Sequence, residues 1–328
     1  MDQATAGGGA STQTQTSTPY VFSGWQPWYE GIDRAVGTAD LAFDVVPPVA
    51  RKQYVNALRI DLTNEHVSFC TTPAGGLYQT LGKTVTEFLS EEPAVMVAIN
   101  ANFSWYDQSA NFSLLGLAVS QGNVVCDPTK PAPRPAPPTT EADVPDQSYV
   151  GAMAMLITEG NAVTFQLVTQ ANPDFQHLNP YTAIAGSPQP MKGGWPPQQQ
   201  VSGQPILLVE NGANQATRQE TPAEEIAGRT GVGLSADGQS LYLVTLDGCE
   251  NTAEQFAYGG GYYDIAQWLI IAGADKGLNL DGGGSTTMAC RDSDNDPVLM
   301  NVPYGSEGAP GYQRLVGNYF GVVTQPLS

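Results

Sequence analysis

The sequence predicts an α+β fold that is rich in strands, with mixed sheets and a few helices in a single domain. Three observations support this prediction. Residues 54–62 alternate apolar and polar side chains, short apolar runs are separated by glycine turns such as residues 159–161 and 236–238, and few segments have helical periodicity. Strands and helices do not alternate regularly, and no repeat of fixed period is visible, which excludes a doubly wound sheet and an eight-fold barrel.

The first clear strand covers residues 54–62. There Leu58, Ile60 and Leu62 alternate with charged residues, a period of two that is typical of a half-buried strand. The short apolar run at residues 67–69 predicts a strand that returns along the first.

A helix is predicted to follow. Thr84 and Glu87 have the spacing of a capping box at a helix start, and Pro93 ends the helix. The continuous apolar run at residues 94–99 then reads as a buried strand, which brings residues 100–103, Asn-Ala-Asn-Phe, to its end.

The second half of the chain predicts a hairpin, a helix and another strand. The hairpin joins residues 232–234 to residues 241–244. Residues 262–272 place apolar side chains on one helical face, and Gly273 suits a C-terminal cap. Residues 276–280 form the strand that follows this helix.

The domain organisation follows from composition. Residues 1–20 are rich in Ser, Thr, Gln, Gly and Ala, and we expect a flexible leader that remains after an export signal is removed. This predicts a secreted or extracytoplasmic protein. Residues 21–328 form the domain, with a proline-rich extended surface loop at residues 128–146.

Charge and hydropathy exclude two classes of partner. Lys and Arg number 13 against 32 Asp and Glu, a net charge of -19, so the overall field repels nucleic acids. No run of apolar residues approaches the ~18 that a membrane span needs. No pattern indicates a particular oligomeric state.

The four cysteines predict two disulfides. Cys70, Cys126, Cys249 and Cys290 form no Cys-x-x-Cys pair and have only two histidines to help them, so a zinc site is hard to assemble. Four cysteines allow three connectivities, of which we favour Cys249 with Cys290.

The strongest chemical motif is a carboxylate followed by three glycines. Asp281 ends a predicted buried strand, and glycines after it let backbone amides approach a ligand and form an anion-binding concavity. A tight turn without a ligand is the structural alternative. The candidate ligand-binding residues of this loop are Gly282, Gly283, Gly284, Ser285 and Thr286.

Three segments in this order and spacing resemble the phosphodiester glycosidase family: residues 228–233 (Gly-Arg-Thr-Gly-Val-Gly), 243–248 (Leu-Val-Thr-Leu-Asp-Gly) and 278–288, which contain the three glycines. Residues 98–103 resemble the family's strand that ends in an Asn-Phe turn, and residues 314–318 resemble its closing strand. The resemblance implies hydrolysis of a sugar-1-phosphodiester, such as that of N-acetylglucosamine, in a glycan or a phosphate-bridged polysaccharide. The C1–O bond breaks and a phosphate monoester leaves. No cofactor is implied as a requirement, although the sequence leaves room for a divalent cation.

Asp281 and Asp247 both end apolar strands, so we expect them to converge at one edge and to give the paired carboxylates that a glycosidase needs. We expect Asp281 to be the principal catalytic carboxylate and Asp247, which also ends an apolar strand, to be its partner or a substrate ligand. Asp264 is a third candidate, although it stands where the family usually has Glu. For Asp247 the alternative is a residue that merely begins a turn.

Arg229 and Arg314 lie inside the matching segments, and a guanidinium can hold two phosphate oxygens. We assign both to the phosphate, the alternative being a partner for a neighbouring carboxylate. Asn100 and Asn102 are candidate substrate contacts, with a turn cap as the alternative for Asn102.

Two other functions remain in competition with glycoside hydrolysis. One is a carbohydrate-binding or phosphate-binding protein without catalysis, which the Asp264 departure permits. The other is a phosphodiesterase that attacks phosphorus, usually with a metal held by several Asp or His ligands. Residues 292–296 imitate a calcium loop, but Pro297 replaces the required glycine, so a solvated hairpin turn is expected.

Overall fold

The computed structural model describes residues 20–44, 48–107, 109–130, 152–186, 207–216, 226–248, 258–304 and 310–327. Within these residues the chain is rich in strands and has two α-helices, which confirms the α+β prediction. The strands form three larger sheets and one small sheet, and all pairings between named strands are antiparallel.

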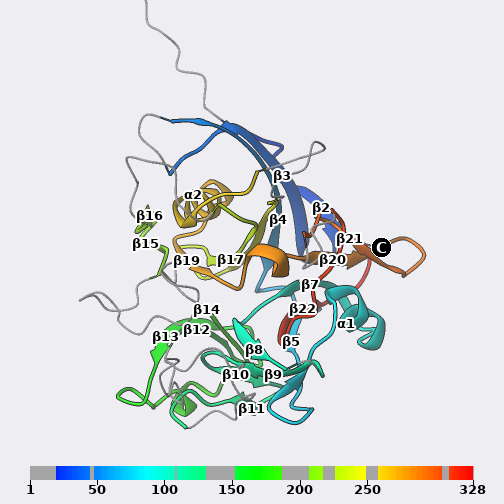
Figure 1. Ribbon diagram of the computed structural model, residues 1–328, viewed down its shortest axis with the longest axis vertical. Coiled ribbons are helices and arrows are strands. Elements are labelled where there is room, and N and C mark those ends of the chain that lie inside the picture. Colours follow the sequence, from blue (N-terminus) through cyan, green and yellow to red (C-terminus); the bar gives the residue numbers. More distant parts are fainter. Residues whose placement is uncertain are drawn as a thin grey trace, which may run out of the picture.

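Sheet I is the largest and has the order β1-β3-β4-β18-β17-β19-β15-β16, with β2 paired to β3 (Figure 1). Its strands are β1 (Tyr20–Phe22), β2 (Gln26–Tyr29), β3 (Ile32–Leu41), β4 (Ala50–Asp61), β15 (Val209–Glu210), β16 (Ala213–Asn214), β17 (Arg229–Leu234), β18 (Ser240–Leu246) and β19 (Lys276–Asn279).

Sheet II has the order β21-β20-β7-β22-β5 and sheet III the order β11-β10-β14-β12-β13. Sheet II contains β5 (Ser68–Thr71), β7 (Val95–Asn100), β20 (Met288–Arg291), β21 (Pro297–Leu299) and β22 (Tyr319–Val323). Sheet III contains β10 (Ala118–Ser120), β11 (Asn123–Cys126), β12 (Ala152–Ile157), β13 (Val163–Val168) and β14 (Thr182–Gly186). The small sheet contains β6 (Thr80–Leu81), β8 (Ser104–Tyr106) and β9 (Asn111–Leu114).

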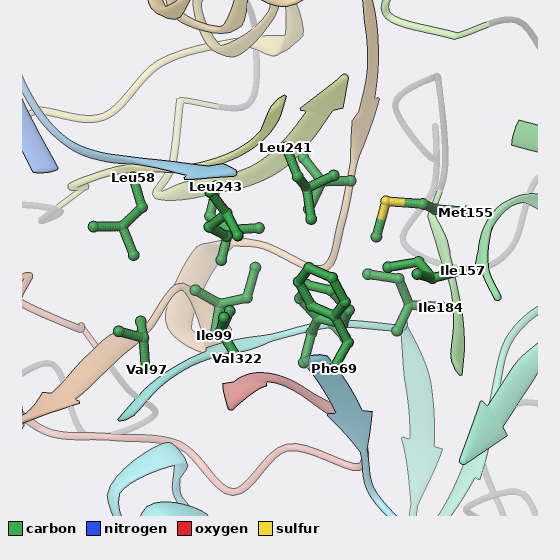
Figure 2. Close-up of a cluster of buried hydrophobic side chains, with 14 of the residues drawn as sticks. Leu58, Phe69, Val97, Ile99, Met155, Ile157, Ile184, Leu241, Leu243 and Val322 are labelled. Carbon is green, nitrogen blue, oxygen red and sulfur yellow. The ribbon is translucent and has the colours of Figure 1, made fainter. Parts of the chain in front are cut away.

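One hydrophobic core joins the three larger sheets. Figure 2 shows Leu58, Leu241 and Leu243 of sheet I facing side chains of sheets II and III. The side chains that they face include Phe69, Val97, Ile99, Met155, Ile157, Ile184 and Val322. Because the three sheets bury their apolar faces in this common core, they stabilise one another and fix where their strand ends lie.

Each helix covers the other face of one sheet. Helix α2 (Tyr262–Ala272) packs on sheet I, where the Trp268 ring is so close to Gly37 that a Cβ there would lie 2.5 Å from it. Helix α1 (Val85–Glu91) packs on sheet II, with Phe88 stacked on Tyr319.

Most of the local predictions are confirmed. Thr84 caps α1 through the expected capping box, and α2 ends at Gly273, whose φ of 115° only glycine adopts readily. The hairpin is formed by β17 and β18. Residues 292–296 make the turn between β20 and β21, in which Asp292 Oδ1 accepts the backbone N–H groups of Asp294 and Asp296.

Two predictions are wrong. The run at residues 67–69 does lead into a strand, but β5 pairs with β22 of sheet II and does not return along β4. The two disulfides are not formed, because Cys70, Cys126 and Cys290 are free and buried. The fourth cysteine, Cys249, lies outside the described residues.

Other expectations lie outside the described part of the chain. They include residues 1–19 of the leader and residues 131–146 of the proline-rich loop. None of the described helices is both long enough and apolar enough to cross a membrane.

Candidate active site

Three strand ends meet at one edge of sheet I. Strand β17 begins where its antiparallel neighbours β18 and β19 end, so Arg229 at the start of β17 lies beside the residues that follow those strands. Asp247 follows β18, and Asp281 follows β19 after Leu280. The motif segments therefore converge, as the sequence predicted for the two carboxylates.

Asn100 joins this edge to sheet II. It is fully buried at the end of β7, and its side-chain amide donates to the Asp281 carbonyl at 2.6 Å. Its Oδ1 accepts the Thr230 hydroxyl at 2.8 Å and the Thr287 N–H at 3.1 Å. Asn100 thus holds both ends of the loop formed by residues 282–286, the glycine loop, against β17.

The glycine loop is a tight turn whose amides are largely engaged. The Gly282 N–H donates to Asp281 Oδ1, and the Gly283 N–H donates to the Gly228 carbonyl at 2.8 Å. The N–H groups of Ser285 and Thr286 donate back to carbonyls within the loop. The expected concavity of successive free amides is therefore not formed, and the side chains around the loop are the groups left to bind an anion.

Asp281 is partly buried at the start of this loop. Burial raises the pKa of Asp281 to about 6. Hydrogen bonds from the Ser285 hydroxyl and the Gly282 amide oppose this rise, as do the positive charges of Arg314 and Arg229. The Asp281 carboxylate is therefore ionised near neutral pH and interacts electrostatically with both arginines.

Arg229 is held in place from helix α2. It is buried, its Nε donates to the Gly260 carbonyl at 3.0 Å, and its guanidinium carbon lies 4.3 Å from the centre of the Tyr262 ring. The ring and the carbonyl fix the plane of the guanidinium.

Arg314 approaches the loop from the segment before β22. A Cβ built on Gly284 would lie 2.8 Å from Arg314 Nη2 and 2.9 Å from the Tyr304 carbonyl oxygen, so the guanidinium lies directly against the glycine loop. Its Nε is buried and has no hydrogen-bond partner among the described residues. A buried donor without a partner is costly, and a bound anion would satisfy it.

Asp247 is more deeply buried than Asp281, with 3% of its surface exposed. Its oxygens accept hydrogen bonds from the Asn301 side chain at 3.0 Å and from the Val302 N–H at 3.2 Å. Burial raises the pKa of Asp247 to about 7, and these two hydrogen bonds oppose the rise.

Asn301 is a residue of this site that the sequence did not predict. Its side-chain amide donates both to Asp247 and to the Thr286 carbonyl, while its Oδ1 accepts the Met288 N–H at 2.7 Å. Asn301 thereby connects Asp247 to the glycine loop. It belongs to none of the motifs, so no pattern in the sequence pointed to it.

Asp264 has a different position from the other two carboxylates. It is fully buried near the start of α2, where it accepts the N–H groups of Phe43 and Gly261, both at 2.8 Å, and pairs with Arg51 at 2.9 Å. All of these partners are protein groups, so the geometry gives Asp264 a structural position. The Gly261 N–H that it accepts comes directly after Gly260, whose carbonyl accepts Arg229 Nε, so Asp264 supports the segment that holds Arg229.

Asn102 is also tied entirely to protein groups. Its amide donates to the Leu115 and Leu117 carbonyls, and its Oδ1 accepts the Ala185 N–H and the Asn318 amide. This uses both donors and both acceptor positions, which favours a structural role for Asn102 over a contact with substrate.

In the described part of the chain, no group of three or more His, Cys, Asp or Glu side chains has the arrangement of a metal site.

Comparisons with known proteins give one family. The family model for phosphodiester glycosidases matches residues 95–323. The chain resembles the zebrafish N-acetylglucosamine-1-phosphodiester alpha-N-acetylglucosaminidase catalytic domain auto-inhibited by its pro-peptide, with 16% identity and a TM-score of 0.57, covering 94% of this chain and 89% of that one. It also resembles a protein of Burkholderia pseudomallei assigned as exported, with 12% identity and a TM-score of 0.55, covering 98% and 100%. At these identities the two likenesses show the fold. No curated protein matches the chain in sequence.

Proposed function

Because the chain belongs to the phosphodiester glycosidase family, whose members are glycosidases acting on phosphodiester-linked sugars, we propose that it hydrolyses a sugar-1-phosphodiester within a glycan or a phosphate-bridged polysaccharide. The observation that carries this proposal is the position of Asp281, a carboxylate at a strand end that feels the charges of Arg229 and Arg314. A carboxylate beside two cations suits a substrate in which a sugar carbon is bonded to a phosphate.

The two arginines bind the phosphate in this proposal. In the reaction the C1–O bond breaks, its electron pair remains on the phosphate oxygen, and the guanidinium groups stabilise the charge that develops there. The buried Nε of Arg314, which has no partner among the described residues, is one donor available for this contact. The fixed plane of Arg229 over Tyr262 pre-orients the other guanidinium.

The two carboxylates have different roles in this proposal. Asp281, with a pKa of about 6, is ionised and acts at C1, as a nucleophile or as the base that takes a proton from the attacking water. Asp247, with a pKa of about 7, retains a proton in a larger fraction of molecules and acts as the acid or as a ligand of the substrate. Water supplies the oxygen that ends on C1.

The likeness to an exported bacterial protein supports an extracytoplasmic location, which we include in the proposal. The three free buried thiols do not add support for an extracytoplasmic location, because the expected sign of export was disulfide bonds.

The decisive experiment is hydrolysis of a synthetic N-acetylglucosamine-1-phosphodiester in ¹⁸O-labelled water, followed by mass spectrometry of both products. We expect the label in the sugar. Label in the phosphate would mean attack at phosphorus and would overturn the proposal. A second reaction in strong chelator should proceed at the same rate. Binding without turnover of this substrate and of hexose 1-phosphodiesters would favour the carbohydrate-binding alternative.

A further inference from the structure

A hollow lies in sheet III, away from the two carboxylates. It has a volume of about 680 Å³, within the range of small-molecule sites. Three connecting segments form it: the β10–β11 turn, the β12–β13 turn and residues 175–181 before β14.

This hollow lies at the opposite end of β14 from the candidate active site. Strand β14 begins at Thr182, next to the hollow, and ends at Gly186, where a Cβ would lie 2.0 Å from the Asn279 carbonyl of β19. Asn279 is two residues before Asp281. A strand of this length spans roughly 15 Å, so the hollow is a separate site.

The floor of the hollow is apolar and its rim is polar. Val119 and Phe175 are buried at its base, with Leu178 beside them. Around them lie the side chains of Glu159, Gln176, Asn179 and Tyr181, which make no hydrogen bond to any described residue. The hollow therefore offers an apolar surface surrounded by a carboxylate, two carboxamides and a phenol that are available to a ligand.

The charge of the lining selects the ligand class. Glu159 is the one charged side chain among the described lining residues, and no Lys or Arg accompanies it. This lining repels phosphate and other anions, in contrast to the arginines near Asp281. A neutral sugar ring fits the chemistry, because its C–H face packs on apolar and aromatic groups while its hydroxyls bond to carboxamides and carboxylates.

We propose that this hollow is an accessory binding site for a neutral saccharide unit, distinct from the site that holds the sugar phosphate. Its segments are positioned by the core of sheet III. The Tyr181 N–H donates to the Ile157 carbonyl at 2.8 Å, and the Gly122 N–H donates to the Tyr181 carbonyl at 2.8 Å. The backbone of Tyr181 thus joins its own segment to the other two, and the hollow is formed before a ligand arrives.

The test uses saturation-transfer NMR to measure binding of three neutral saccharides, diacetylchitobiose, maltotriose and cellotriose, to the full chain carrying Asp281→Asn. At least one probe should show transfer, and binding should weaken at least tenfold in Tyr181→Ala and in Gln176→Ala. The control is Tyr106→Ala, which removes an exposed tyrosine of β8 outside the hollow. Thermal melting of each variant verifies that it is folded.

Two outcomes would overturn the proposal: no transfer from any of the three probes, or transfer that is unchanged in both hollow variants. Hydrolysis is measured separately from saccharide binding. Tyr181→Ala in an otherwise wild-type chain should cleave a small synthetic sugar phosphodiester at the wild-type rate, so a loss of saccharide binding can be told apart from a loss of hydrolysis. A peptide or apolar dye that competes for the hollow while the saccharides do not would also contradict it.

Discussion

The guanidinium of Arg229 lies over the ring of Tyr262, with its carbon 4.3 Å from the ring centre. Arg229 begins a strand of sheet I and Tyr262 begins helix α2. The contact therefore uses the packing of the helix on the sheet to orient a side chain that we assign to phosphate binding. Asp264 supports it by holding the start of the same helix.

Tyr262→Leu tests this orientation. The leucine keeps an apolar side chain on α2 but removes the ring face, an interaction of roughly 1–2 kcal/mol for a desolvated guanidinium. We expect kcat/KM for a sugar phosphodiester to fall by roughly 5- to 30-fold, with most of the change in KM. Tyr263→Leu, the neighbouring tyrosine of α2, is the matched control. Equal losses in the two variants would contradict the orienting role.

Asp281→Asn tests the principal carboxylate. Loss of a nucleophile or base should lower kcat by about 100- to 10,000-fold, while thermal stability is retained because asparagine can still accept the Gly282 N–H. For the wild type, the rate should rise with pH as Asp281 ionises near pH 6 and should fall above about pH 7 as Asp247 loses its proton. A near-wild-type rate in the variant would remove Asp281 from the mechanism.

Asp247→Asn tests whether the second carboxylate is buried, through the pH dependence of the free energy of unfolding. The folded-state pKa of about 7 lies above the unfolded value of about 4, so the folded state retains a proton that the unfolded state releases. Wild-type stability should therefore fall as pH rises from about 4 to about 7, by up to roughly 4 kcal/mol relative to the variant. Urea unfolding of both proteins from pH 4 to pH 8 measures this difference. Parallel stability curves would show that Asp247 is not buried as described.

The sequence was informative where a contact is local. Thr84 and Glu87 are three residues apart, and the capping box that they form was visible in that spacing. The amphipathic face of residues 262–272 was visible for the same reason. The partner of β5 could not be predicted from the sequence. Its partner β22 lies some 250 residues further along the chain, and two short apolar strands carry no signal for their pairing.

The candidate site divides in the same way. The sequence predicted that Asp247 and Asp281 converge because each ends an apolar strand, and in the structure both strands pair with β17. It could not reveal Asn301, whose role depends on Asp247 lying 54 residues earlier in the chain. For Asn102 the sequence left a sugar contact and a turn cap open, because its four hydrogen bonds come from segments that only the fold brings together.

Asn301→Asp tests the residue that the sequence did not reveal. The aspartate keeps an oxygen for the Met288 N–H but loses the donor to Asp247 and places a second carboxylate beside it. Both changes raise the pKa of Asp247, so the fall in rate at alkaline pH should move to higher pH. Asn123→Asp, an exposed change of equal charge in β11, is the control for long-range charge. A loss of stability with an unmoved pH profile would reduce Asn301 to a structural residue.

The buried thiols give a prediction that replaces the two disulfides. Cys70, Cys126 and Cys290 are free, and burial raises the pKa of Cys70 and of Cys126 to about 12 and that of Cys290 to about 11. Because the thiolate is the reactive form, none of the three should react with iodoacetamide in the native protein. All three should react after unfolding in guanidinium without a reducing agent, as peptide mass spectrometry would show. Labelling that requires a reducing agent would restore the disulfides, and labelling of the native protein would show that these side chains are accessible.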